Sequence, residues 1–96
     1  MQQLIWTRQA RADLQHHYDY LLSFNQQSAL RALRAIVKAA RQLASTPELG
    51  VVIDKNSGLR KWPVAFGKTG YVIYYISMSG QVIIARVYHG RQSRPY

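Results

Sequence analysis

The sequence predicts an α+β domain in which two helices pack on one face of a small, mainly antiparallel sheet. The prediction depends on the length of 96 residues, on two consecutive helical patterns in the first half of the chain and on two strand-like runs in the second half. A chain this short forms one domain with a modest core. Residues 1–96 are therefore expected to form a single domain with the element order β-α-α-β-β-β.

A first strand and a first helix are expected at the start of the chain. Leu4-Ile5-Trp6 is a short apolar run, and the Thr7 hydroxyl can cap a following helix by accepting a hydrogen bond from a backbone amide. From Arg8 to about Phe24, apolar residues recur at spacings of three and four, which is typical of an amphipathic helix. These apolar positions are Ala10, Leu14, Tyr18 and Leu21.

A second helix is expected from Ala29 to about Ala44, after a break at Asn25-Gln26-Gln27-Ser28. Such a short break makes the two helices an antiparallel hairpin. The expected apolar stripe consists of Leu30, Leu33, Val37, Ala40 and Ala44. A neighbouring basic stripe consists of Arg31, Arg34, Lys38 and Arg41. No carboxylate lies within this helix, and the basic stripe is either a solvated face or a binding face.

The second half of the chain predicts an irregular connection followed by three strands. Pro47 ends the second helix, and residues 46–58 are expected to connect irregularly around Val51-Val52-Ile53. A strand over residues 59–64 contains Pro63, which places it at a sheet edge or a bulge. Runs 71–78 and 81–88 are rich in β-branched and aromatic residues, and Ser79-Gly80 between them predicts a hairpin.

Both faces of this hairpin carry apolar side chains, because side chains alternate between the two sides of a strand. One side of the first arm has Tyr71, Ile73, Tyr75 and Ser77. The other side has Val72, Tyr74, Ile76 and Met78. In the second arm, Val82, Ile84, Arg86 and Tyr88 are expected to share a side.

One helical hairpin covers one face of a sheet, so the other face is expected to bind a partner through an exposed aliphatic and aromatic surface. Two other arrangements would remove this surface. The tail or the connection over residues 46–58 would fold across it, or the chain would form a homodimer.

Composition narrows the classes of function. The chain has 13 Lys plus Arg against 4 Asp plus Glu, and this net charge of +9 favours an anionic partner, unless it only maintains solubility. The absence of cysteine excludes disulfides and thiolate metal sites. His16 and His17 point in different directions on a helix and His89 stands alone, so no metal or cofactor is expected. No signal peptide or membrane span is expected, and the cytoplasm is the default location.

The residues best suited to chemistry lie near the end of the chain. They are Arg86, His89, Arg91, Arg94 and Tyr96, with Arg60 and Lys61 on the preceding strand. Arginine can stabilise a phosphorane, and histidine or tyrosine can exchange protons during metal-free RNA cleavage. The same arginines would also bind an acidic partner or a phosphate backbone without chemistry. The expected partner-binding residues are Arg60, Trp62, Tyr71, Tyr75, Ile84, Arg86, Tyr88, His89, Arg91 and Arg94.

Four segments resemble the RelE/ParE superfamily of bacterial toxins, and they are closer to its ParE branch. They are Gly70-Tyr71-Val72-Ile73-Tyr74-Tyr75, Arg86-Val87-Tyr88-His89-Gly90-Arg91, Leu59-Arg60 and Ala12-Asp13-Leu14. The resemblance covers essentially the whole chain. It implies the toxin of a type II toxin-antitoxin system, a non-enzymatic inhibitor of DNA gyrase that blocks replication. A cognate antitoxin would neutralise it in a hetero-oligomer.

The superfamily also implies an alternative function, a RelE-like endoribonuclease that cleaves mRNA on the ribosome. Such enzymes carry lysines on the strand before the hairpin and an arginine after its first Gly-Tyr, where this sequence has Pro63, Ala65 and Val72. That difference favours gyrase inhibition. The nuclease would use Arg60, Arg86, His89, Arg91 and Tyr96. A third function, that of a plain nucleic-acid-binding module, would follow from the charge alone.

Overall fold

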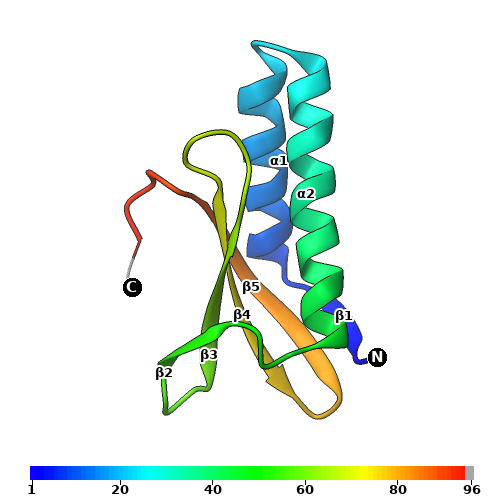
Figure 1. Ribbon diagram of the computed structural model, residues 1–96, viewed down its shortest axis with the longest axis vertical. Helices are drawn as coiled ribbons and strands as arrows, with labels where there is room; N and C mark the ends of the chain where they lie inside the picture. Colours follow the sequence, from blue (N-terminus) through cyan, green and yellow to red (C-terminus); the bar gives the residue numbers. More distant parts are fainter. Residues whose placement is uncertain (95–96) are drawn as a thin grey trace.

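A computed structural model describes residues 1–94 and places two helices against one face of a five-stranded sheet (Figure 1). The elements are β1 (Gln3–Trp6), α1 (Arg8–Leu22), α2 (Gln26–Ser45), β2 (Val51–Asp54), β3 (Leu59–Val64), β4 (Tyr71–Met78) and β5 (Gln81–His89). The predicted α+β fold with a helical hairpin is confirmed. Neither helix is long and apolar enough to cross a bilayer within the described part of the chain.

The strands lie in the order β1-β5-β4-β3-β2. β1 runs parallel to β5, and all other neighbours are antiparallel, so the sheet is mainly antiparallel as predicted. The hairpin between β4 and β5 is also confirmed, with positive φ angles of 52° at Ser79 and 75° at Gly80. Positive φ at both central residues matches the right-handed twist of the two strands.

The irregular connection predicted for residues 46–58 is wrong in part, because it contains the strand β2. β2 pairs antiparallel with β3, with Val51 opposite Lys61 and Val52 opposite Arg60. It is an exposed edge strand, and its short apolar triplet carries no alternation that would distinguish it from a loop. Pro63 lies in the part of β3 that does not pair with β2. The amide hydrogen that proline lacks therefore removes no hydrogen bond between β3 and β2.

Side-chain caps fix the starts of both helices. The Thr7 hydroxyl accepts a hydrogen bond from the Ala10 amide at 3.1 Å, as predicted. Asn25 caps α2 by accepting from the Ser28 amide at 3.0 Å. The predicted start of α2 at Ala29 is therefore wrong by three residues, because Asn25 caps the helix rather than belonging to an extended break.

The buried face of α2 is made mainly of small residues. Its buried residues are Ala29, Ala32, Ile36, Ala39, Ala40, Leu43 and Ala44. The predicted stripe is wrong at Leu30, Leu33 and Val37, which are only half-buried. Alanine side chains let the helix approach the sheet closely, and Leu30 and Leu33 line a groove against Leu14 and Tyr18 of α1 instead.

A β-bulge at Ala85 changes which side chains of β5 face the helices. Tyr75 pairs with Ile84 but Tyr74 pairs with Arg86, so one residue of β5 is left over. Val82 and Ile84 lie in the core, whereas Arg86 and Tyr88 lie on the opposite face beside Tyr74. The prediction that Ile84, Arg86 and Tyr88 share a side is therefore wrong.

The helices cover only one face of the sheet, as predicted, but the other face is only partly exposed. Tyr74 and Tyr88 stack there with ring centroids 5.1 Å apart, and they are 3% and 7% exposed. The chain after β5 turns back on this side (Figure 1). The surface that stays open lies at the other end of the face, and it is made of Ile5, Ile76, Met78 and Ile83. We call these four residues the apolar row.

Candidate functional site

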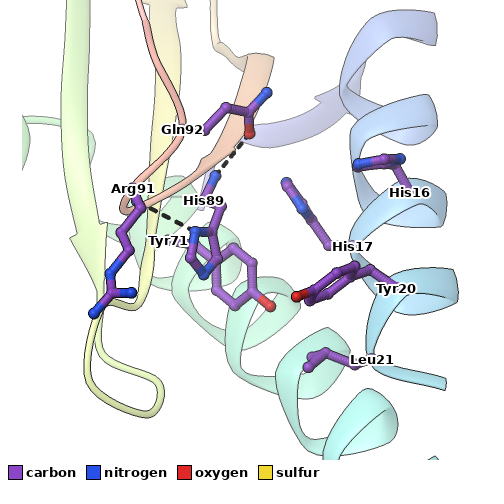
Figure 2. A pocket seen from close by; sticks show the side chains of 8 residues that line it. All are labelled: His16, His17, Tyr20, Leu21, Tyr71, His89, Arg91 and Gln92. Carbon is purple, nitrogen blue, oxygen red and sulfur yellow. Dashed lines mark hydrogen bonds between the residues drawn. The ribbon is translucent and has the colours of Figure 1, made fainter. Parts of the chain in front are cut away.

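A pocket of about 420 Å³ lies between the second half of α1 and the end of β5. Its lining consists of His16, His17, Tyr20, Leu21, Tyr71, His89, Arg91 and Gln92. Figure 2 shows the α1 side chains on one side, His89 and Arg91 on the other, and Tyr71 between them. This histidine-tyrosine pocket therefore joins residues from the two ends of the chain.

His17 and Tyr71 form the buried floor of the pocket, with ring centroids 5.0 Å apart. The Nε2 atom of His17 lies 2.8 Å from the Val87 carbonyl oxygen, which can only accept, so Nε2 carries the hydrogen. Burial lowers the pKa of His17, and burial raises the pKa of Tyr71. Both shifts favour the neutral side chain near neutral pH.

His89 is held by hydrogen bonds at both ring nitrogens. Its Nδ1 accepts from the Arg91 amide at 3.2 Å, so the neutral ring carries its hydrogen on Nε2. That Nε2 lies 3.0 Å from the Thr69 hydroxyl oxygen and donates to it. The backbone of the next residue, Gly90, lies so close to Thr69 that a Cβ on Gly90 would collide with the Thr69 carbonyl. The turn after β5 thus fixes the orientation of His89.

The two arginines that follow His89 lie in different surroundings. Arg91 is exposed and lines the histidine-tyrosine pocket. Arg94 lines a separate hollow beside Pro63 and Val72, where its Nη1 donates to the Gly90 carbonyl at 3.2 Å. The Nε of Arg94 is buried and has no hydrogen-bond partner within residues 1–94.

Arg86 lies outside the pocket and forms a bidentate ion pair with Asp13 of α1. The Nε to Oδ2 distance is 2.8 Å and the Nη2 to Oδ1 distance is 3.0 Å. Asp13 also accepts a hydrogen bond from the Val87 amide at 2.8 Å. β1 pairs with β5 only as far as Ile84, so Asp13 takes the place of a strand partner for Val87. The hydrogen bond with Asp13 raises the pKa of Arg86. Arg86 therefore ties α1 to β5.

Arg60 lies beside the middle of β4, whereas His89 lies beside its first residue. It pairs in register with Tyr75, whereas His89 pairs with Tyr71, and four residues of a strand span about 13 Å. Its Nη1 donates to the Gly50 carbonyl at 2.7 Å. The buried Tyr75 hydroxyl donates to the Pro47 carbonyl at 2.6 Å in the same region.

Within residues 1–94, three of the predicted site residues line the histidine-tyrosine pocket, namely Tyr71, His89 and Arg91. Two others meet on the opposite sheet face, where the Arg86 guanidinium lies 4.8 Å from the centre of the Tyr88 ring. Tyr71, Tyr75 and Ile84 lie in the core, Trp62 is half-buried against it, and Tyr88 is buried on the other face. Tyr96 lies outside the described residues.

Sequence reasoning missed five residues of the pocket. One is Gln92 after β5, and the other four are His16, His17, Tyr20 and Leu21 of α1. Tyr20 lies one helical turn from both histidines. The rings of His16 and His17, predicted to point in different directions, lie edge to face with centroids 5.8 Å apart. Only the packing of α1 beside β5 brings these residues to His89. No three metal-ligating side chains gather within residues 1–94.

Comparisons with known proteins agree with this architecture. The family model described as "ParE toxin of type II toxin-antitoxin system, parDE" matches residues 4–94. "Toxin RelE3" of Caulobacter vibrioides is 36% identical over 85 residues, covering 88% of this chain and 90% of that protein. "Toxin RelE2" of the same organism is 36% identical over 89 residues, covering 93% and 96%.

A solved structure, "Chromosomal ParDE TA system from P. aeruginosa", shares the fold with a TM-score of 0.73 and 25% identity, covering 93% of this chain and 96% of that one. This likeness of fold, together with the family match and the two toxin relatives, makes the chain a member of the RelE/ParE superfamily of toxins. The chain belongs to the ParE toxin family of type II toxin-antitoxin systems.

Proposed function

We propose that this toxin inhibits DNA gyrase without catalysing a reaction and so blocks replication. The observation that carries the proposal is the dispersal of the cations that RNA cleavage would need. Arg60 donates to the Glu48 and Gly50 carbonyls outside the pocket, and Arg86 is bound to Asp13, also outside it. Phosphoryl transfer needs such groups around one phosphate, within hydrogen-bond reach.

The state of His89 supports the same proposal. A general base needs a ring nitrogen with a free lone pair within about 3 Å of the proton that it removes. The Nδ1 lone pair of His89 already accepts from the Arg91 amide, and Nε2 donates to Thr69. His17 likewise donates to the Val87 carbonyl from a buried position. The pocket is therefore better suited to binding a partner than to proton transfer.

The antitoxin is expected to bind the apolar row on the sheet face away from the helices. Ile5, Ile83 and Ile76 lie side by side across β1, β5 and β4, and Met78 beside them is 55% exposed. The three isoleucines are half-buried, and a partly exposed aliphatic strip of this kind suits an extended or helical segment of a second protein. The Pseudomonas structure is itself of a ParDE toxin-antitoxin system. We therefore expect a hetero-oligomer in the cytoplasm.

A gyrase supercoiling assay tests the proposed function. Purified toxin titrated into gyrase and relaxed plasmid is expected to abolish supercoiling, and premixing with the antitoxin is expected to restore it. Arg91→Ala removes the exposed cation of the pocket and is expected to weaken inhibition about tenfold, as the loss of one charged contact does. Arg8→Ala, exposed at the start of α1, is the matched control. Unchanged supercoiling at high toxin excess would refute the proposal.

The second candidate function is ribosome-dependent mRNA cleavage. Two observations favour it: the relatives named RelE2 and RelE3, and the meeting of Tyr71, His89 and Arg91 in one pocket. Primer extension on a translated message after toxin induction distinguishes it from gyrase inhibition. New cleavage ends that vanish in both His89→Ala and Arg91→Ala, with gyrase unaffected, would establish the nuclease in place of the inhibitor.

A further inference from the structure

The face of α2 that points away from the sheet carries an unbroken line of positive charge. It consists of Arg31, Arg34, Lys38 and Arg41, and all four side chains are exposed. We keep the name basic stripe for these four residues. At about 100° per residue, they fall within about 80° of the helix circumference. The middle of the stripe is opposite Ile36, and the buried positions Ala32 and Ala39 lie one turn before and one turn after Ile36.

Within residues 1–94, no carboxylate forms an ion pair with the basic stripe. α2 contains no Asp or Glu. The ion pair found within residues 1–94 joins Arg86 to Asp13, away from α2. Arg31 donates weakly to the Ser28 hydroxyl at 3.3 Å, which leaves its charge unchanged. A solvated helix face normally mixes both signs, so four cations in line indicate an anionic partner.

The dimensions of the stripe fit a duplex backbone. From Arg31 to Arg41 the helix rises about 15 Å, which equals the axial rise of about four base pairs. Three of the four cations are arginines, whose planar donor groups bind phosphate oxygens in a bidentate manner.

The neighbours of the stripe argue against an acidic protein as the occupant. The exposed residues that share its side of α2 are polar, namely Gln27, Gln42 and Ser45. A protein interface needs an apolar centre. The apolar side chains Met1, Leu49 and Trp62 line a hollow at the Lys38 and Arg41 end of the stripe and not at its centre. Phosphate binding needs only cations and hydrogen-bond donors. We propose that the basic stripe binds the phosphate backbone of duplex DNA, independently of whether gyrase is the target.

Salt-dependent binding of the full chain to duplex DNA tests this inference without gyrase. Fluorescence anisotropy of a labelled duplex would be followed from about 50 mM to about 200 mM salt. The triple variant Arg34→Gln, Lys38→Gln, Arg41→Gln is expected to reduce the magnitude of the log-log salt slope by about 2.7, which is 0.9 per lost phosphate contact. These side chains are exposed, so the fold is expected to persist, as circular dichroism would verify.

The matched control is the triple variant Arg8→Gln, Lys55→Gln, Lys68→Gln, which removes the same charge from exposed positions outside α2. Its salt slope is expected to stay close to that of the native chain. Equal losses in both triple variants, or no binding of the native chain at low salt, would overturn the proposal. Polyglutamate is the second probe, and a stripe variant that loses polyglutamate but keeps DNA would assign the surface to an acidic protein instead.

Discussion

The hydroxyl of Tyr75 holds the connection between α2 and β2 against the sheet. It donates to the Pro47 carbonyl at 2.6 Å and accepts from the Gly50 amide at 2.8 Å, and the side chain is fully buried. Gly50 has no side chain at this contact, where a Cβ would lie 2.6 Å from the Tyr75 hydroxyl oxygen. Pro47 and Gly50 are both buried, and the Tyr75 hydroxyl satisfies one backbone group of each.

Tyr75→Phe is expected to lower the free energy of unfolding by about 2 kcal/mol, because it leaves a buried amide and a buried carbonyl without their partner. Urea denaturation followed by circular dichroism would measure the change. Tyr20→Phe, at a position 61% exposed, is the control and is expected to stay within about 0.5 kcal/mol of the native chain. Equal stability of the two variants would contradict the role given to Tyr75.

His17 is expected to make the stability of the fold depend on pH. Burial is the largest cause that lowers its pKa below 6.5, while the Val87 carbonyl and Asp13 oppose the shift and His16 and His89 add to it. The unfolded chain therefore takes up the proton first as the pH falls. The contribution of neutral His17 to stability is fully present above pH 6.5, the pKa of histidine in the unfolded chain. It is lost as the pH falls from this value toward the lower pKa of His17 in the folded protein.

The measurement is the urea midpoint at about pH 7.5 and at about pH 5. His17→Gln keeps a donor for the Val87 carbonyl and is expected to reduce the difference between the two midpoints. The exposed His16→Gln is the control and is expected to retain the difference. A native chain that is equally stable at both pH values would contradict the expected loss of stability at low pH.

The start of α1 is joined to the sheet by a single side chain. Thr7 accepts from the Ala10 amide as the helix cap, and its hydroxyl also donates to the Ile84 carbonyl at 2.9 Å. Asn25 at the start of α2 performs only the capping function, accepting from Ser28 at an exposed position. The same type of cap is therefore a link to the core in one helix and a local feature in the other.

Thr7→Ala is expected to cost about 2 kcal/mol of stability, more than the roughly 1 kcal/mol expected for Asn25→Ala, because it removes a cap and a link to β5 together. Thr7→Ser keeps the hydroxyl and should recover most of the loss. Thermal denaturation of the three variants would rank them. An Asn25→Ala variant less stable than Thr7→Ala would contradict this ranking.

The helices and the β4-β5 hairpin were predictable because their signals are local. The period of apolar residues, the Thr7 hydroxyl and the Ser79-Gly80 turn each lie within a few residues of the element that they define. β2 was not predictable, because its four residues become a strand only by pairing with β3. Nothing in Ile84-Ala85-Arg86 marks the bulge, yet it alone determines which side Arg86 faces.

The distribution of exposed groups over the whole molecule separates three surfaces. The basic stripe lies on the helical layer, the apolar row lies on the opposite side of the sheet, and the histidine-tyrosine pocket opens between α1 and the end of β5. The sequence predicted an open sheet face, but not that Tyr74 and Tyr88 are buried there. It predicted His89 and Arg91 as site residues, but not the α1 residues opposite them, which depend on how the helix packs on β5.

Met78→Asp places a charge in the apolar row and is expected to weaken antitoxin binding at least about tenfold. Met78 is 55% exposed, so the isolated fold is expected to tolerate the change. Co-purification of the toxin with its antitoxin, followed by titration calorimetry, would measure the effect. Phe24→Asp, 73% exposed near the tip of the helical hairpin, is the control. Unchanged antitoxin affinity in Met78→Asp would place the antitoxin elsewhere.

The parallel pairing of β1 with β5 has a consequence for biosynthesis. Residues 3–6 find their hydrogen-bond partners in residues 81–84, so the first strand made is among the last to be paired. Every nascent chain that ends before β5 leaves β1 without the strand that it pairs with. The molecule thus completes its sheet only late in translation, and its shorter precursors lack the finished surfaces on which a toxin depends.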